Sequence, residues 1–208
     1  MTRLLLIRHG QSVSNISKQF TGQSDVPLSP LGIDQAEKTA DYIINNFKVD
    51  AIYSSDLSRA FDTAKAVADK IGLIPIPSEN LREIFAGKWE MMPYNEISEK
   101  YNDEYQIWLN DNSNARPTGG ESVKELKNRV YSEILKIARE NDGKTVVIGT
   151  HATPIRTFIS RCLSLKDFQW VPNASITIAE YNNNKFSIIK SGISDHLGDL
   201  ETTLPKDV

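Results

Sequence analysis

The sequence contains Leu4-Leu5-Leu6-Ile7-Arg8-His9-Gly10, a short apolar run that ends in a histidine, and the pattern recurs at Val146-Val147-Ile148-Gly149-Thr150-His151. Such runs of Val, Ile and Leu, bounded by glycine and polar residues, are typical of strands buried on both faces of a sheet. Ligands of open α/β sheets bind beyond the carboxyl ends of these strands. Because neighbouring strands lie about 4.8 Å apart, His9 and His151 are expected to meet over one small ligand if the two strands pair. An enzyme fits this arrangement better than a binding module.

The residues beside His9 indicate the kind of ligand. Arg8 carries a permanent positive charge and a planar fork of donors that matches phosphate or carboxylate oxygens. Gly10 has no side chain, so the backbone can approach an anion closely. A neutral imidazole can attack phosphorus directly and form a phosphohistidine, which divides one difficult transfer into two easier steps. The stretch therefore predicts a site for a phosphoryl group, with His9 as the nucleophile.

The rest of the chain alternates expected strands and helices. Ser29 caps a helix that runs toward Asn46, and a second helix, capped by Asp56 or Ser58, ends at Gly72. Further helices are expected over residues 123–140 and from Thr153, and further strands over residues 51–53, 74–76, 145–149, 175–181 and 186–190, the last two joined by a turn at residues 182–184. This order predicts an α/β fold of three layers, in which helices flank a mostly parallel central sheet.

Residues from about 80 to 122 depart from this alternation. They are rich in Trp, Tyr, Asn and Glu, with short helices expected around residues 94–101 and 104–109. Long irregular segments within compact domains are usually functional, so this segment is expected to cover the rim of the sheet. A chain of 208 residues suits one domain that buries roughly 70% of its unfolded surface. We therefore expect residues 1–208 to form a single domain with a cap-like insertion around residues 80–122.

Composition bounds the partners and the compartment. A formal net charge of −3 argues against a nucleic-acid or anionic-membrane surface. The first apolar run is far shorter than a signal-peptide core or a membrane span. The single Cys162 cannot form an internal disulfide. These features predict a cytoplasmic protein that binds neither nucleic acid nor membrane, and they indicate no particular oligomeric state.

The pattern around His9 is the first of six motifs that follow one another along nearly the whole chain. They are Leu6-Ile7-Arg8-His9-Gly10-Gln11-Ser12 with Asn15, Phe20-Thr21-Gly22 with Pro27-Leu28-Ser29-Pro30-Leu31-Gly32, Ser54-Ser55-Asp56-Leu57-Ser58-Arg59-Ala60, Leu81-Arg82-Glu83 with Gly87-Lys88-Trp89-Glu90, Pro117-Thr118-Gly119-Gly120-Glu121-Ser122, and the His151 segment. Together these motifs resemble the histidine phosphatase superfamily, also called phosphoglycerate mutase-like. The resemblance implies the phosphoglycerate mutase-like fold and phosphoryl transfer through a phosphohistidine.

The resemblance also implies catalytic roles for five residues. His9 is the nucleophile, and Glu83 protonates the leaving group. Arg8, Arg59 and a protonated or donating His151 surround the oxygens of the phosphoryl group. Positioned cations of this kind supply most of the stabilisation of a phosphoryl-transfer transition state. No metal or cofactor is then needed.

A second set of residues is expected to line the pocket rather than to react. By resemblance, Asn15 and the backbone around Thr21, Gly22 and Gln23 lie beside the phosphate, with Ala152 close to it. The expected partner is a small phosphorylated metabolite.

Local sequence alone allows less specific roles for several of these residues. Arg59 has acidic neighbours such as Asp56 and could form a solvated ion pair on a helix surface. Glu83 could pair with the adjacent Arg82 at the surface. Asn15 could be only a loop or cap residue. The motifs, taken together, favour the functional roles.

Other enzyme classes lack the residues that they require. Three scattered histidines and one cysteine do not provide a zinc ligand set. Gly143-Lys144-Thr145 resembles the end of a nucleotide-binding P-loop, but Ala138 stands where its first glycine belongs. Cys162 lacks the histidine-cysteine-to-arginine loop of a cysteine phosphatase. A noncatalytic phospholigand-binding domain is the rival from another class, and the presence of both histidines, both arginines and Glu83 argues against it.

Within the family, the segment from Trp89 to Ser122 resembles the broad-specificity phosphatase branch. It lacks the Arg-His-Tyr-Gly stretch that phosphoglycerate mutases carry after the acid. The predicted function is hydrolysis of phosphomonoesters of small metabolites, with phosphoglycerate mutase as the alternative. Two departures from the family pattern, Met91 and Ala152-Thr153 in place of glycines, concern the identity of the substrate more than the phosphoryl chemistry.

Overall fold

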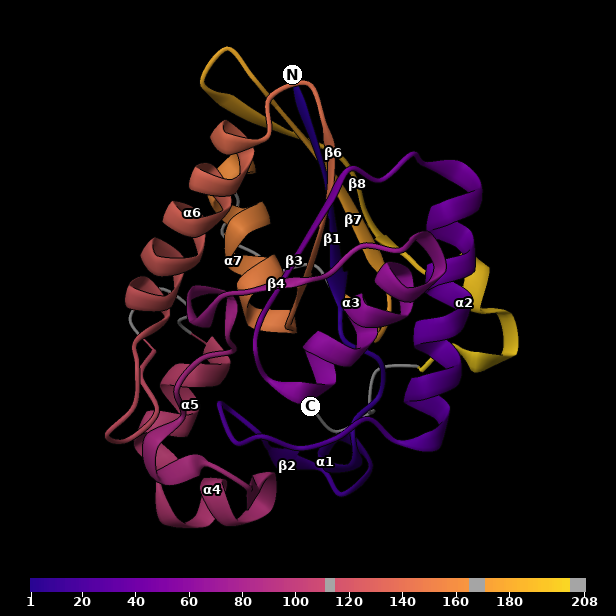
Figure 1. The fold of residues 1–208 in the computed structure, drawn as a ribbon. Coiled ribbons are helices and arrows are strands. Elements are labelled where there is room, and N and C mark those ends of the chain that lie inside the picture. The colour runs from indigo at the N-terminus through magenta and orange to yellow at the C-terminus, as the bar shows by residue number, and fades with distance from the viewer. Residues whose placement is uncertain (111–114, 165–170, 203–208) are drawn as a thin grey trace.

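The computed structural model describes residues 1–110, 115–164 and 171–202. Its central sheet has six strands in the order β4-β3-β6-β1-β7-β8, and Figure 1 shows helices on both sides of it. The strands are β1 (Thr2–Arg8), β3 (Ala51–Ser54), β4 (Ile76–Pro77), β6 (Thr145–Thr150), β7 (Ile176–Asn182) and β8 (Lys185–Ile193), and the flanking helices are α2 (Pro30–Asn46), α3 (Ser58–Ile71), α6 (Val123–Glu140) and α7 (Ala152–Leu163). β7 is antiparallel to both of its neighbours, whereas β1, β3, β4 and β6 pair in parallel. The predicted three-layer α/β fold with a mostly parallel sheet is confirmed.

β1 is buried on both faces, as its unbroken apolar run predicts. Leu4 and Leu6 belong to the hydrophobic cluster that α6 and α7 cover, while Leu5 and Ile7 belong to the cluster that α2 and α3 cover. All four side chains are fully buried, and each contributes about 1.5–3 kcal/mol to folding. Because β1 is fixed in the centre of the molecule, the residues that follow it emerge at a defined place on the rim.

The helix boundaries follow the expected caps with one exception. The Ser29 hydroxyl accepts a hydrogen bond from the Gly32 amide at the start of α2, and α3 ends at Gly72 in the left-handed conformation with φ 70°. The expectation that Asp56 or Ser58 caps α3 is wrong, because Leu57 is the N-cap and makes no side-chain cap. Asp56 is engaged elsewhere, by the guanidinium of Arg82. None of the described helices is both long and apolar enough to cross a membrane.

The edges of the sheet show where sequence periodicity is a weaker guide. The strand expected at residues 74–76 is only Ile76–Pro77, and Ile74 is 85% exposed. Pairing with β3 covers only Ile76 and Pro77, because β3 itself ends at Ser54, the partner of Pro77. At the other edge, Asn183 and Asn184 both have positive φ, at 48° and 60°. That is the backbone of a tight hairpin turn, and it confirms the predicted connection of the last two strands.

Part of the segment around residues 80–122 folds at the end of the molecule toward which β1 runs. Its short helices are α4 (Tyr94–Lys100) and α5 (Asn102–Asn110), close to the predicted ranges, and Figure 1 shows them beyond the carboxyl ends of β1 and β6. A two-stranded sheet of β2 (Gln19–Phe20) and β5 (Met92–Pro93) joins the segment to the loop after β1. Residues 111–114 of the segment lie outside the described part of the chain.

Candidate active site

Pairing of β1 with β6 brings the two histidines together. Arg8 lies opposite Thr150 in the parallel register, so the residues that follow both strands emerge side by side. The amide of His9 donates to the Thr150 carbonyl at 3.0 Å. The imidazole centroids of His9 and His151 are 5.2 Å apart, with ring planes at 62°. The expectation that the two histidine strands are neighbours is confirmed.

The His9 ring is held in one tautomer by its own backbone. Nδ1 lies 2.7 Å from the Gly10 carbonyl oxygen, which can only accept, so Nδ1 carries the hydrogen and Nε2 of the neutral ring carries a lone pair. Burial lowers the pKa of His9 well below 6.5, and the charges of Arg59 and Arg8 lower it further. The ring is therefore neutral at physiological pH and presents a nucleophilic nitrogen.

His151 is fully buried next to His9 and is also neutral. Its Nε2 lies 2.9 Å from the hydroxyl of Ser55. Burial lowers the pKa of His151 well below 6.5. The charge of Arg59 lowers it further, and His9 and Arg8 have smaller effects in the same direction. Of the two states expected from sequence, protonated or donating, the surroundings favour a neutral ring with one N–H.

The two arginines of the motifs are buried cations. The Nη1 group of Arg8 donates to the Val171 carbonyl at 2.6 Å, and the guanidinium of Arg59 donates to the carbonyls of Gly22 and Ser24 at 2.8 and 2.9 Å. Arg59 is 1% exposed, so the alternative of a solvated ion pair on a helix surface is wrong. Burial lowers the pKa of Arg8 to about 10, which leaves the side chain charged at neutral pH.

Glu90 fastens the loop that holds Arg59, a role that the motif alone did not reveal. One carboxylate oxygen accepts from the amides of Gln23 and Ala86 at 2.8 and 2.9 Å. The other accepts from the amide and hydroxyl of Ser24 at 2.7 and 2.5 Å. A Cβ on Gly22 would lie 2.1 Å from this carboxylate, so the contact requires glycine there.

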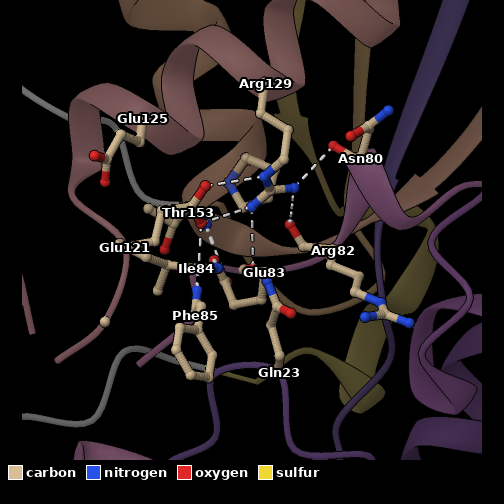
Figure 2. A network of polar contacts seen from close by, with 12 residues as sticks. Gln23, Asn80, Arg82, Glu83, Ile84, Phe85, Glu121, Glu125, Arg129 and Thr153 are labelled. Carbon is tan, nitrogen blue, oxygen red and sulfur yellow. Dashed lines mark hydrogen bonds and ion pairs between the residues drawn. The ribbon is translucent and has the colours of Figure 1, made fainter. Parts of the chain in front are cut away.

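Glu83 lines the cavity of the site and is not paired with Arg82. Its Oε1 accepts from the Ile84 amide at 2.8 Å, and its Oε2 accepts from the Thr153 amide at the N-terminus of α7 at 3.2 Å. Figure 2 shows these contacts, with the Arg82 side chain directed away from Glu83. Arg82 forms its ion pair with Asp56, so the local alternative of an Arg82–Glu83 surface pair is wrong.

These groups surround one cavity of about 510 Å³. Eight of the ten residues predicted for the site line it: Arg8, His9, Asn15, Thr21, Gly22, Arg59, Glu83 and Ala152. His151 lies behind His9 and does not reach the lining. Gln23, whose backbone was expected beside the phosphate, is not among the lining residues, and its side-chain amide donates to the Glu83 carbonyl at 3.0 Å.

Asn15 combines the two roles that the sequence left open. It forms a capping box with Ser12 at the start of α1 (Val13–Ile16), in which its Oδ1 accepts from the Ser12 amide at 3.0 Å. The same residue lines the cavity. The Asn15 side chain therefore serves both as a helix cap and as a pocket residue. The hydrogen bond of its oxygen to the Ser12 amide fixes the side chain at the cavity wall.

Several lining residues were missed by reasoning from sequence. Arg156 lies on α7 one turn after Ala152, and this i to i+4 spacing places both on one helix face and could have identified it. Tyr94, Tyr105 and Trp108, from α4 and α5, form an aromatic wall. Burial raises the pKa of Tyr94 to about 12. No local motif marks these aromatic residues, because ordinary core packing gives the same pattern.

Met91 occupies a backbone conformation that favours glycine. Its φ is 59°, in the left-handed region, which costs most L-residues about 1–2 kcal/mol. This explains why the family pattern has glycine at that point. Met91 is not among the residues that line the cavity, so the departure concerns the backbone of the cap rather than a contact with ligand.

The arrangement suits transfer of a phosphoryl group. A neutral imidazole with a free Nε2 lies between buried cations, and a carboxylate faces the same cavity. Anions also favour the N-terminus of a helix, here that of α7, whose first residues line the cavity. Within the described residues, no group of three or more His, Cys, Asp or Glu side chains is placed to hold a metal ion.

Comparison with known proteins agrees with this chemistry. The sequence profile of the histidine phosphatase superfamily (branch 1) matches residues 4–194. Phosphoserine phosphatase 1 of Hydrogenobacter thermophilus is 31% identical over 205 residues, which cover 96% of each protein. Bacillus stearothermophilus YhfR has a TM-score of 0.90 at 26% identity, with 95% of this chain and 100% of that chain covered. A mutant phosphoserine phosphatase from Entamoeba histolytica in complex with phosphoserine has a TM-score of 0.82 at 30% identity over 95% of this chain and 100% of that chain. The chain therefore belongs to the histidine phosphatase superfamily, branch 1.

Proposed function

We propose that this protein is a metal-independent phosphomonoester hydrolase that acts through a phosphohistidine at His9. The observation that carries the proposal is the fixed tautomer of His9, whose Nδ1–H is bound to the Gly10 carbonyl at 2.7 Å. The ring thus presents Nε2 to a cavity that Arg8, Arg59 and Glu83 also line.

In the first half of the reaction, Nε2 of His9 attacks phosphorus and the bond from phosphorus to the ester oxygen breaks. Arg8 and Arg59 stabilise the charge that develops on the equatorial oxygens. Glu83 gives its proton to the departing alkoxide, a step typically worth 10²–10⁴ in rate. Glu83 faces the cavity, and the amides of Ile84 and Thr153 hold its carboxyl in place there.

In the second half, water replaces the alcohol. Glu83, now a carboxylate, takes a proton from the water as its oxygen attacks phosphorus. The bond from phosphorus to Nε2 breaks, inorganic phosphate leaves, and His9 returns to its neutral form. His151 stays neutral through both halves, because its burial disfavours a positive charge.

Arg156 favours substrates that carry a second anionic group. It lines the same cavity as the proposed phosphate cradle and is close enough to Arg8 to lower the pKa of that residue. A small phosphomonoester with a carboxylate can place its phosphate beside Arg8 and Arg59 and its carboxylate beside Arg156. Two of the similar proteins are named for phosphoserine. In a panel of phosphomonoesters, phosphoserine and 3-phosphoglycerate should have lower KM values than glycerol phosphate.

The first prediction concerns the covalent intermediate. Enzyme quenched during turnover of a labelled phosphomonoester should carry phosphate on a nitrogen of His9, and His9→Ala should lose both label and turnover. Activity should survive a chelator, and vanadate should inhibit by imitating five-coordinate phosphorus. Label on a serine, threonine or aspartate would overturn the mechanism.

A hydrolase and a phosphoglycerate mutase differ in the molecule that accepts the phosphoryl group from the phosphohistidine, which is water in the first and a phosphoglycerate in the second. With 3-phosphoglycerate and catalytic 2,3-bisphosphoglycerate, the hydrolase should release inorganic phosphate faster than it forms 2-phosphoglycerate. Efficient isomerisation, with negligible phosphate release from every ester of the panel, would make the protein a mutase.

A further inference from the structure

The proposed acid, Glu83, lies on a segment without regular structure. The segment joins the short helices η1 (Glu79–Leu81) and η2 (Gly87–Trp89). Within the described part of the chain, the carboxylate itself is held only by the amide of the next residue and by the Thr153 amide. Its position therefore depends on what fixes the backbone on either side of it.

One side chain from α6 fixes the backbone before and at Glu83. Nη1 of Arg129 donates to the carbonyls of Asn80 and Arg82 at 2.9 and 3.1 Å, and Nη2 donates to the carbonyl of Glu83 at 3.3 Å. Nε and Nη2 also bind both carboxylate oxygens of Glu121, at 2.9 and 2.7 Å. Figure 2 shows the Arg129 guanidinium at the centre of this network, next to the Glu83 backbone. With side chains 20% and 15% exposed, Arg129 and Glu121 are shielded enough from solvent for these contacts to be well ordered.

Glu121 fixes the backbone after Glu83. Its Oε2 accepts from the Phe85 amide at 3.3 Å, and its own amide donates to the Phe85 carbonyl at 2.8 Å. The neighbouring Gly120 allows this approach, since a Cβ there would lie 2.3 Å from the Phe85 carbonyl oxygen. The Arg129–Glu121 pair thus holds the chain from Asn80 to Phe85, with Glu83 between its two ends.

We propose that Arg129, through its ion pair with Glu121, is a positioning residue that sets the place of the Glu83 carboxyl for proton transfer to the leaving group. The inference rests on the proposed function of Glu83. Arg129 does not line the cavity, so it acts through the backbone and not on the substrate. Its planar fork serves several carbonyls, including that of Glu83, and one carboxylate together, which the point charge of a lysine cannot do.

The test compares two esters of similar shape, phenyl phosphate and p-nitrophenyl phosphate. Phenolate needs protonation to depart much more than p-nitrophenolate does. Arg129→Gln should lower kcat for phenyl phosphate about tenfold more than kcat for p-nitrophenyl phosphate, with little change in either KM. Glu121→Gln, which leaves Arg129 its carbonyl contacts, should shift the same ratio in the same direction by less, and it supplies the measurement if Arg129→Gln does not fold.

Arg3→Gln is the matched control. Arg3 binds Glu180 through Nε and Nη2, at 3.2 and 2.8 Å, at the opposite end of β1. Its loss should lower stability and leave the ratio of the two esters unchanged. An equal loss of activity on both esters in Arg129→Gln and Glu121→Gln would reduce the pair to a structural role and overturn the inference. If Glu83→Gln leaves the ratio of kcat for the two esters unchanged, the assignment of Glu83 as the acid is wrong. If Glu83→Gln changes this ratio but Arg129→Gln and Glu121→Gln do not, only the role of Arg129 is overturned.

Discussion

At the scale of single residues, the site depends on burial that controls charge. His9 remains neutral because it is enclosed with Arg59 and Arg8, two cations that disfavour a third positive charge beside them. The same arginines stay charged because carbonyl oxygens solvate them, those of Gly22 and Ser24 for Arg59 and that of Val171 for Arg8. A neutral nucleophile and two charged arginines thus share one buried site.

The prediction at this scale concerns Glu83. Replacement by Gln keeps the size of the side chain and removes the transferable proton. Turnover of alkyl phosphates should fall by about 10²-fold or more, while turnover of p-nitrophenyl phosphate should fall much less, because p-nitrophenolate departs without protonation. An equal loss on both classes of ester would assign Glu83 to binding or folding.

At the scale of elements, the loop after β1 is shaped by the start of α2. A Cβ on Gly10 would lie 2.3 Å from the Gly32 carbonyl oxygen, and a Cβ on Gly32 would lie 1.9 Å from the Gln11 carbonyl oxygen. The hydroxyl of Ser29 adds a hydrogen bond to the Gln11 side chain at 2.8 Å. The helix N-terminus and the His9 loop therefore pack backbone to backbone. This close approach explains why both motifs contain a glycine.

Gly32→Ala tests this contact. In an ordinary helix the change stabilises by about 0.5–1 kcal/mol, but here the methyl group must displace the backbone of Gln11. We expect a loss of about 1–3 kcal/mol in unfolding free energy, measured by urea denaturation, with lower turnover because the loop beside His9 shifts. Ile33→Ala is the control on the same turn: Ile33 is 54% exposed, so its change should stay within about 0.5 kcal/mol. A neutral or stabilising Gly32→Ala would contradict the tight packing.

At the scale of the whole molecule, the buried histidines couple stability to pH. The pKa values of His9 and His151 lie well below 6.5 in the folded protein, first because of burial and then because of Arg59. As pH falls below about 6.5, the unfolded chain takes up protons that the folded chain does not, so the free energy of unfolding decreases. Above that pH both states have neutral histidines, and this contribution to stability is fully present.

The corresponding prediction is a loss of stability in mild acid. Between pH 6.5 and the folded pKa values, each of these histidines should lower the free energy of unfolding by up to about 1.4 kcal/mol per pH unit. Urea unfolding at pH 7.5 and pH 5.5 should show a steeper decline for the wild type than for the double variant His9→Asn, His151→Asn. Carboxylates contribute alike to both proteins, so equal declines would show that the two histidines are not buried as neutral groups.

Local patterns of residues were enough to predict several features of the fold and the site. The apolar runs before His9 and His151 predicted buried parallel strands. Alternate side chains of such a run point to opposite faces of the sheet, so an unbroken run packs against a core on each face. Caps such as Ser29 and Gly72 marked helix ends, because they satisfy backbone groups within a few residues. The motifs around Arg59 and Glu83 identified the chemistry, although not the surroundings of either side chain.

Features that depend on distant partners were set by packing between elements. Arg59 became a buried cation through the carbonyls of Gly22 and Ser24, and the Gln23 side chain binds the Glu83 backbone. Arg129 took its place around Glu83 from a helix almost fifty residues further along the chain. Such contacts form only when separate elements pack, so no local spacing in the sequence encodes them, and the charge and position of each reacting group follow from that packing.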